Sequence, residues 1–128
     1  MSRAASAVLF LALAGCPAQE LWPGPGRPFQ GRMHAIPGTI ESEHFDEGGE
    51  GFAYHDLDAK NQGAPYRESG VDIEPRADAS NQYNIGWARE GEWLAYTVEV
   101  KETGTYLLET RVASSKKGGI FHLEFDGL

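Results

Sequence analysis

Glu41 and Glu43 are the first residues of this chain whose type and spacing could do chemistry. They lie two positions apart in Thr39–Phe45, which we predict to be a strand, so both would project from one face, roughly 7 Å apart. Three interpretations are open: a bound hard cation with oxygen ligands, that is Ca²⁺, a solvated strand face, or a catalytic pair. From the residues alone the solvated face is the simplest. Catalytic carboxylates usually come from different elements across a cleft, so a same-strand pair gives weak support for catalysis.

Aromatic rings beside amide, carboxylate and guanidinium groups form a second candidate set, in the long polar region Asp46–Gly70 and the stretch Tyr83–Val100. A ring can pack on the C–H face of a pyranose, and planar polar groups can bind its hydroxyls. Structural interpretations are also open. We expect Trp93 and Tyr96 to be packed inside, Trp87 either to cap the fold or to contact a ligand, and Tyr66 and Arg67 to form an aromatic–cation pair.

Other catalytic and metal sites find little support. His55-Asp56 could be half of a catalytic triad, but no Ser or Cys in a nucleophile-type turn accompanies it. The four His residues lack zinc-ligand spacing, and Cys16 is the only cysteine.

The elements that must position these groups are strands. Glu92–Val100 alternates, with Leu94, Tyr96, Val98 and Val100 forming an apolar face. Val71–Glu74 predicts a short strand, and Thr105–Ala113 and Ile120–Phe125 also alternate. Short Gly-containing turns separate the last three, which predicts an antiparallel meander. Sixteen Gly and seven Pro residues agree with an all-β fold rich in turns.

The charge of the chain narrows its partners. From Glu41 onward there are 18 acidic and 8 basic residues, a balance of −10. Such a surface repels phosphates, so nucleic acid is a poor candidate partner, and a membrane is expected to be a partner only through a lipid anchor. A neutral ligand or a cation suits this acidic surface better. We also expect the protein to be a monomer.

The first residues are typical of an export signal. Arg3 precedes the short apolar run Ala7–Ala14, so residues 1–15 are predicted to be a signal peptide. Leu13–Cys16 resembles the bacterial lipoprotein signal motif, which would make Cys16 the lipidated new N-terminus; cleavage that leaves a free Cys is the alternative. Residues 16–35, rich in Pro and Gly, are expected to be an extended linker, and residues 36–128 the folded module.

The end of the chain predicts an incomplete fold. Asp126-Gly127 is a hairpin signal, and only Leu128 follows it. We expect a module that is truncated at its C-terminal end, as in a fragment of a longer protein.

An ordered series of motifs resembles carbohydrate-binding module family 6, from about Ile36 to Gly127. The series is Ile40–Glu43, Tyr54–Asp56, Tyr66–Arg67, Val71–Glu74, Tyr83–Trp87, Gly91–Val98, Gly104–Tyr106, Arg111–Ser114, Gly118–Gly119 and Phe121–Glu124. The resemblance implies an antiparallel β-sandwich of the jelly-roll, galactose-binding-like type. Such modules bind sugars and are appended to glycoside hydrolases.

The resemblance also implies roles for particular residues. Glu41 and Glu43 would bind a structural Ca²⁺, completed by backbone oxygen and by an Asp beyond Leu128. Sugar would bind in a cleft among loops, with Tyr66 as the candidate ring and Asn61 among the candidate contacts. Because some members use the concave sheet face, Trp87, Asp72 and Glu74 are candidates there.

These observations lead to one functional expectation with two alternatives. We expect a non-catalytic, calcium-stabilised module that binds a polysaccharide or oligosaccharide, exported or held at the bacterial cell envelope by a lipid anchor. The first alternative is the N-terminal module of a glycoside hydrolase whose catalytic domain lies outside this chain. The second is a structural Ca²⁺-binding adhesion module that binds protein.

Overall fold

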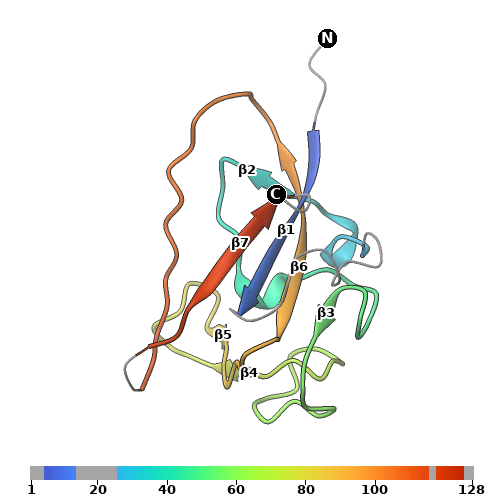
Figure 1. Cartoon of the computed structure of the whole chain (residues 1–128), viewed down its shortest axis with the longest axis vertical. Coiled ribbons are helices and arrows are strands. Elements are labelled where there is room, and N and C mark those ends of the chain that lie inside the picture. Colours follow the sequence, from blue (N-terminus) through green and yellow to red (C-terminus); the bar gives the residue numbers. More distant parts are fainter. Residues whose placement is uncertain (1–4, 14–25, 116–117, 126–128) are drawn as a thin grey trace.

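The computed structural model describes residues 5–13, 26–115 and 118–125, with side chains described from residue 26 onward. Strands predominate in this part of the chain, which confirms the predicted all-β class (Figure 1). The strands are β1 Ala5–Leu13, β2 His34–Ile36, β3 Tyr54–His55, β4 Ile73–Pro75, β5 Tyr83–Ile85, β6 Trp93–Val100 and β7 Phe121–Phe125. Two single-turn 3₁₀ helices, η2 Phe29–Gly31 and η3 Ser42–His44, complete the described elements.

The larger sheet is built around β6. Its strand order is β2-β6-β1-β7, and β3 pairs with β6 as well. β1 is antiparallel to β6, with Ala5 opposite Val100 and Ala12 opposite Trp93. It is also antiparallel to β7, with Leu9 opposite Phe125. β1 therefore separates β6 from β7, and its residues are those that the sequence assigns to an export signal.

The smaller sheet is the antiparallel pair β4–β5, in which Ile73 lies opposite Ile85. The core lies between this pair and β6. Its buried members are Phe45, Ala53, Tyr54, Val71, Ile73, Leu94, Tyr96 and Val98. Two sheets that cover one apolar core agree with the predicted sandwich.

β6 is the strand that the sequence predicted best. Leu94, Tyr96 and Val98 lie in the core as expected. Gly91 has a φ of 93°, which a glycine adopts without strain, so the chain turns there into the strand. Trp93 and Ala95 are also buried, and β3 covers the edge of β6 at Trp93 and Leu94.

The first predicted strand is wrong. Thr39–Phe45 does not form a strand; Ser42–His44 is the 3₁₀ helix η3, and Phe45 is fully buried beneath it. Other backbone takes one edge of β6, since β2 pairs with residues 98–100 and Asp46 N–H donates to Ala95 C=O over 2.8 Å.

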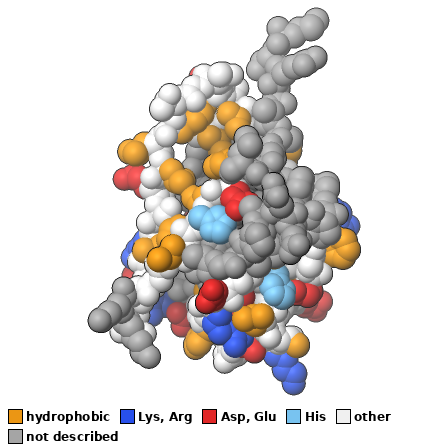
Figure 2. All heavy atoms as spheres, viewed as in Figure 1, with side chains coloured by type: hydrophobic (Ala, Val, Ile, Leu, Met, Phe, Trp, Pro, Cys, Tyr) orange, Lys and Arg blue, Asp and Glu red, His pale blue; other side chains and the backbone are white. Residues whose placement is uncertain are grey.

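The predicted strand Thr105–Ala113 and the meander are also wrong for this structure. Residues 105–113 are assigned to no strand and are exposed. They run along the outside of the molecule from β6 to β7 (Figure 1). Figure 2 shows hydrophobic side chains along the left of this face, over that segment. A strand position between β6 and β7 exists, but β1 fills it.

The described part of the predicted linker is packed onto the module. Arg27 forms a β-bridge with Glu47, the Phe29 ring stacks on His44, and β2 pairs in parallel with β6. The ordered contacts thus begin before Ile36, earlier than the boundary expected from the sequence. None of the helices in the described residues has the length and apolar character needed to cross a membrane.

Candidate functional site

Five of the predicted site residues lie in two clusters with residues that the sequence did not single out, and Asn61 and Asp72 lie in the loop before β4. We call the first the Asn81 cluster: Glu41, Glu43, His44, Tyr66, Ser80 and Asn81. We call the second the Trp87 surface: Asp58, Gln62, Glu74, Trp87 and Arg89. Cys16 lies outside the described residues, so its predicted lipidation stays a prediction.

Glu41 and Glu43 both reach the turn that precedes β5. The Ser80 hydroxyl donates to both carboxylate oxygens of Glu41, over 2.8 and 2.6 Å. The Asn81 amide donates to Oε1 of Glu43 over 2.9 Å. The two carboxylates therefore point to consecutive residues of one turn, although η3 and not a strand carries them.

Glu43 is a buried carboxylate for which the described residues provide no paired cation. Its side chain is fully buried, and its other oxygen lies 3.4 Å from the Ser42 hydroxyl. Among the described residues, no Lys, Arg or His side chain forms an ion pair with it. Burying a charge is costly unless a counter-charge or a metal compensates it. The described residues include no group of three or more His, Cys, Asp or Glu side chains arranged to hold a metal ion.

Tyr66 lies in a row of rings. Its ring centroid is 4.3 Å from that of Tyr83 and 6.2 Å from that of His44, and His44 stacks in turn on Phe29 at 4.5 Å. Its hydroxyl oxygen lies 2.9 Å from Nε2 of His44 and accepts a hydrogen bond from Asn81 over 3.3 Å. Burial lowers the pKa of His44, so this imidazole is neutral at pH 7. Tyr66 is therefore a packed ring and not one that stands open in a cleft.

Arg67 holds this region to the core. Its guanidinium lies 3.7 Å from the Phe45 ring centroid and 4.7 Å from that of Phe29. It donates to the backbone carbonyl groups of Glu43, Phe45 and Asp46. The rings that it stacks on are thus Phe29 and Phe45, where the sequence suggested Tyr66.

Asn61 and Asp72 shape the loop before β4. Oδ1 of Asn61 accepts from the backbone N–H of Gly63 and Ile73, over 2.7 and 3.2 Å, and its amide donates to Ala64 C=O over 2.7 Å. Asp72 is buried and accepts from the Gln62 N–H over 2.6 Å. A Cβ on Gly63 would lie 1.9 Å from Ile73 C=O, so only glycine fits there. These polar groups are used within the fold, which makes both residues supports for the loop.

Trp87 is the exposed ring of the predicted set. Its side chain is 52% exposed, and its φ of 47° lies in the left-handed region that a bulky residue rarely adopts. The preceding Gly86 is fixed by its N–H donating to Asp72 C=O over 2.9 Å. Backbone strain of this kind persists where surrounding contacts enforce it and is common at binding sites.

Charged and amide groups of two loops are linked through Arg89, which lies two residues after Trp87. Arg89 forms an ion pair with Asp58, and the Gln62 amide donates to the same carboxylate over 2.5 Å. The hydrogen bond from Arg89 holds the pKa of Asp58 below its usual value. Glu92 joins the loops, because it accepts from the backbone N–H of Leu57 and of Arg89, over 3.2 and 2.7 Å.

Glu74 completes the Trp87 surface from β4. It lies opposite Asn84 on β5, and its carboxyl carbon lies 3.7 Å from where a Cβ on Gly86 would be. Oδ1 of Asn84 is buried without a hydrogen-bond partner in the described part of the chain. The structure thus brings Asn61, Asp72, Glu74 and Trp87 together around the loops beside β4 and β5, and places Tyr66 with Glu41 and Glu43 instead.

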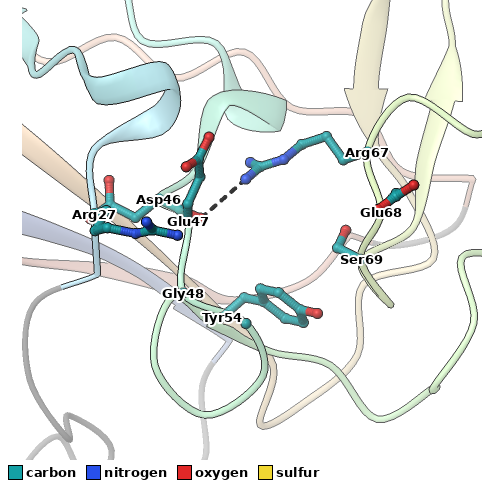
Figure 3. Close-up of a pocket in the computed structure, with 9 residues that line it drawn as sticks. Arg27, Asp46, Glu47, Gly48, Tyr54, Arg67, Glu68 and Ser69 are labelled. Atoms are coloured by element: carbon teal, nitrogen blue, oxygen red, sulfur yellow. Dashed lines mark hydrogen bonds between the residues drawn. The ribbon is translucent and has the colours of Figure 1, made fainter.

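Arg67 also lines a polar pocket of about 440 Å³ (Figure 3). It is lined by Arg27, Asp46, Glu47, Gly48, Gly49, Tyr54, Arg67, Glu68 and Ser69. Its one ring, Tyr54, is buried and belongs to the core. The pocket therefore offers hydrogen-bonding groups but no open aromatic face, unlike the Trp87 surface.

Sequence reasoning missed several of these residues. Ser80 and Asn81 lie in a stretch that carried only a turn signal, and their partners are 39 and 38 residues away. Asp58 and Gln62 carried no signal beyond their place in a long polar loop. Arg89 was not missed, since the sequence already grouped its guanidinium with Trp87 as part of a possible sugar surface.

Comparison with known proteins gives one match. A family model described as carbohydrate binding module (family 6) matches residues 62–128. That range includes Tyr66, Asp72, Glu74 and Trp87 but not Asn61, Glu41 or Glu43. No curated protein and no solved structure matches the chain.

Proposed function

We propose a sugar-binding site for this chain, which belongs to carbohydrate-binding module family 6. Membership in that family makes it a non-catalytic carbohydrate-binding module. The sugar packs on the exposed ring of Trp87. The observation that carries this proposal is that Trp87 combines a largely exposed indole with a left-handed backbone conformation. An exposed indole offers a large apolar area to the C–H face of a pyranose at little cost in side-chain entropy.

The groups around the ring supply the polar contacts. Arg89, Asp58 and Gln62 form a connected set of donors and acceptors, and Glu74 adds a half-buried carboxylate. Sugar hydroxyls both donate and accept, so a mixed set of this kind suits a neutral glycan. The acidic balance of the chain agrees with a neutral ligand.

Affinity electrophoresis tests this site. The full chain is run through gels that contain soluble β-glucan, xylan or agar oligosaccharides, and we expect retardation in at least one gel. Trp87→Ala should run unretarded there. Phe52→Ala is the matched control, since Phe52 is a similarly exposed ring on another loop and its loss should leave retardation unchanged. Equal retardation of Trp87→Ala and the parent chain would overturn the assignment.

We also propose that Glu41 and Glu43 contribute to a structural Ca²⁺ site. The support is the buried Glu43 carboxylate, which has no paired cation among the described residues, beside a second carboxylate and the Ser80 hydroxyl. Oxygen donors of this kind suit Ca²⁺, which takes six to eight of them, so further ligands are required. Bound Ca²⁺ would offset the repulsion of the two carboxylates and link η3 to the turn before β5.

Thermal melting with Ca²⁺ and with a chelator tests the metal proposal. Ca²⁺ should raise the melting temperature of the parent chain, and a Glu41→Gln/Glu43→Gln chain should lose that increase. Glu90→Gln, at an exposed acid, should keep it. A Ca²⁺ effect that persists in the double variant would contradict the assignment.

The wider context of the module is also a proposal. The apolar run and Cys16 support export of the chain and lipid anchoring at the bacterial cell envelope. Mass spectrometry of the mature N-terminus tests this, because lipidation adds acyl mass at Cys16 and Cys16→Ser removes it.

Membership in the family supports a parent glycoside hydrolase. Metal-dependent melting without any glycan binding would favour the adhesion module instead.

A further inference from the structure

We propose that the strand position between β6 and β7 has two competing occupants in this chain. β1 fills it in this structure, and residues 106–113 fill it when β1 is withdrawn. The two arrangements exclude each other, because one position between β6 and β7 accepts one strand. The second arrangement is the meander that the alternation of Thr105–Ala113 predicts.

The registers of β1 specify the second arrangement. In the second arrangement, each β1 residue is replaced by the residue whose number is 101 higher, so Tyr106 takes the place of Ala5 opposite Val100. Leu108 then lies opposite Val98, and Val112 lies opposite Leu94. The same shift places Val112 opposite Leu123 of β7. Residues opposite each other share a face of the sheet, so the apolar side chains would join the core that Leu94 and Val98 already form.

The polar residues of the segment agree with this register. Arg111 would lie opposite Glu124 of β7 on the other face, where Glu124 already pairs with His122 over 2.7 Å. A slip of one residue would turn Glu109 and Arg111 toward the core. The same register therefore gives matching side-chain pairs with both β6 and β7.

The connections have suitable lengths. β6 ends at Val100, so Lys101–Thr105 would form the first turn, and residues 115–120 would form the second. Connections of about two to six residues are the commonest between strands. β1 is antiparallel to both β6 and β7, so a strand that replaces it must also be antiparallel to both. Residues 106–113 meet this requirement, because one hairpin would join them to β6 and a second hairpin would join them to β7.

The exposed apolar side chains favour the exchange. Tyr106, Leu108 and Val112 are 40%, 61% and 67% exposed in this structure. Burial of Tyr106, Leu108 and Val112 would remove apolar surface from water. The exchange would break the ion pair between Arg111 and Asp78, but both side chains are exposed, so this pair contributes little to stability.

Removal of residues 1–15 would drive the exchange in the exported protein, and this trigger alone rests on the proposed export signal. Before cleavage, β1 would keep the sheet in its first arrangement. After cleavage, the vacant position would take residues 106–113.

Hydrogen exchange of the full chain tests the competition without cleavage. In the parent chain, amides of β1 should be protected and those of residues 105–113 should exchange fast. Leu9→Pro removes a backbone donor from β1. In that variant, the amides of residues 105–113 should exchange more slowly by about tenfold or more, as amides do when they enter a protected sheet. Leu9→Val should behave as the parent chain does, and unchanged fast exchange of residues 105–113 in Leu9→Pro would overturn the proposal.

A disulfide trap keeps the test valid if Leu9→Pro unfolds. In a Cys16→Ser chain without residues 1–15, in which the proposal leaves the position to residues 106–113, Glu99→Cys and Leu107→Cys would lie opposite each other, as they do only in the second arrangement. Mild oxidation should cross-link this pair and not the mismatched pair Glu99→Cys and Leu108→Cys. Equal cross-linking of the two pairs, or none in either, would contradict the proposed register.

Discussion

The side-chain amide of Asn81 donates a hydrogen bond to the fully buried carboxylate of Glu43 over 2.9 Å. This contact joins two segments that are 38 residues apart and places the turn before β5 against η3. A charged acceptor inside the protein depends strongly on its donors, because no water replaces a donor that is removed.

Asn81→Ala should therefore destabilise the chain, by about 1–3 kcal/mol, the usual cost of leaving a buried acceptor unsatisfied. The free energy of unfolding from urea titration measures the change. Gln82→Ala, at the exposed neighbour, is the control and should change it little. Equal effects of the two substitutions would show that Glu43 does not depend on this donor.

Asp46 gives a second test of a buried carboxylate. It is fully buried and accepts from the Thr97 N–H over 2.8 Å and from the Thr97 hydroxyl over 2.6 Å. Thr97→Val keeps the shape of the side chain but removes the hydroxyl donor, so we expect a loss of about 1–3 kcal/mol. Thr105→Val, at an exposed position, is the matched control in the same urea titration. A loss that does not exceed the control's would contradict this role of the hydroxyl.

The pH dependence of stability should carry a contribution from Asp56. Mainly burial, with the nearby Glu92 and Asp72 carboxylates, raises its pKa from 3.8 to about 6. The folded chain thus keeps a proton that the unfolded chain has released between these values, so this group lowers stability as pH rises from 3.8 to about 6.

Asp56→Asn should remove this dependence. The free energy of unfolding of the parent chain should fall, relative to that of Asp56→Asn, as pH rises through this window. Glu90→Gln is the control for the loss of an exposed acid. A constant difference between the parent chain and Asp56→Asn across the window would contradict the raised pKa.

Trp87 should show opposite effects on stability and on binding. Its left-handed backbone is strained for a bulky residue, and glycine adopts that conformation freely. Trp87→Gly should therefore leave the melting temperature unchanged or raise it, while glycan binding is lost. Trp87→Ala keeps a Cβ and should not share the stabilisation. A large fall in the melting temperature of Trp87→Gly would mean that the indole supports the fold.

The sequence predicted the centre of the fold because apolar residues that alternate along β6 are side chains that pack into the core. Leu94, Tyr96 and Val98 alternate, and the structure buries them against β4 and β5. Thr105–Ala113 alternates equally well but lies exposed, because the alternation of a strand does not reveal which segment occupies its place in the sheet. Thr39–Phe45 was predicted as a strand from a short pattern, but Ser42–His44 forms a 3₁₀ helix there.

The candidate site was predicted by residue type but not by arrangement. Glu74 lies beside Gly86, the residue before Trp87, whereas Tyr66 joins the row of rings with His44 and Tyr83. Asn61 and Asp72 are used up in backbone hydrogen bonds that a sequence cannot show. Long-range partners such as Asn81 for Glu43 leave no local pattern, so only the structure reveals them.

Isothermal titration with the glycan that retards the chain most tests the central claim directly. The parent chain and Phe52→Ala should bind with the same affinity. Trp87→Ala should bind about tenfold more weakly or worse, which corresponds to at least about 1.4 kcal/mol. An affinity for Trp87→Ala equal to that of the parent chain would show that the sugar binds elsewhere.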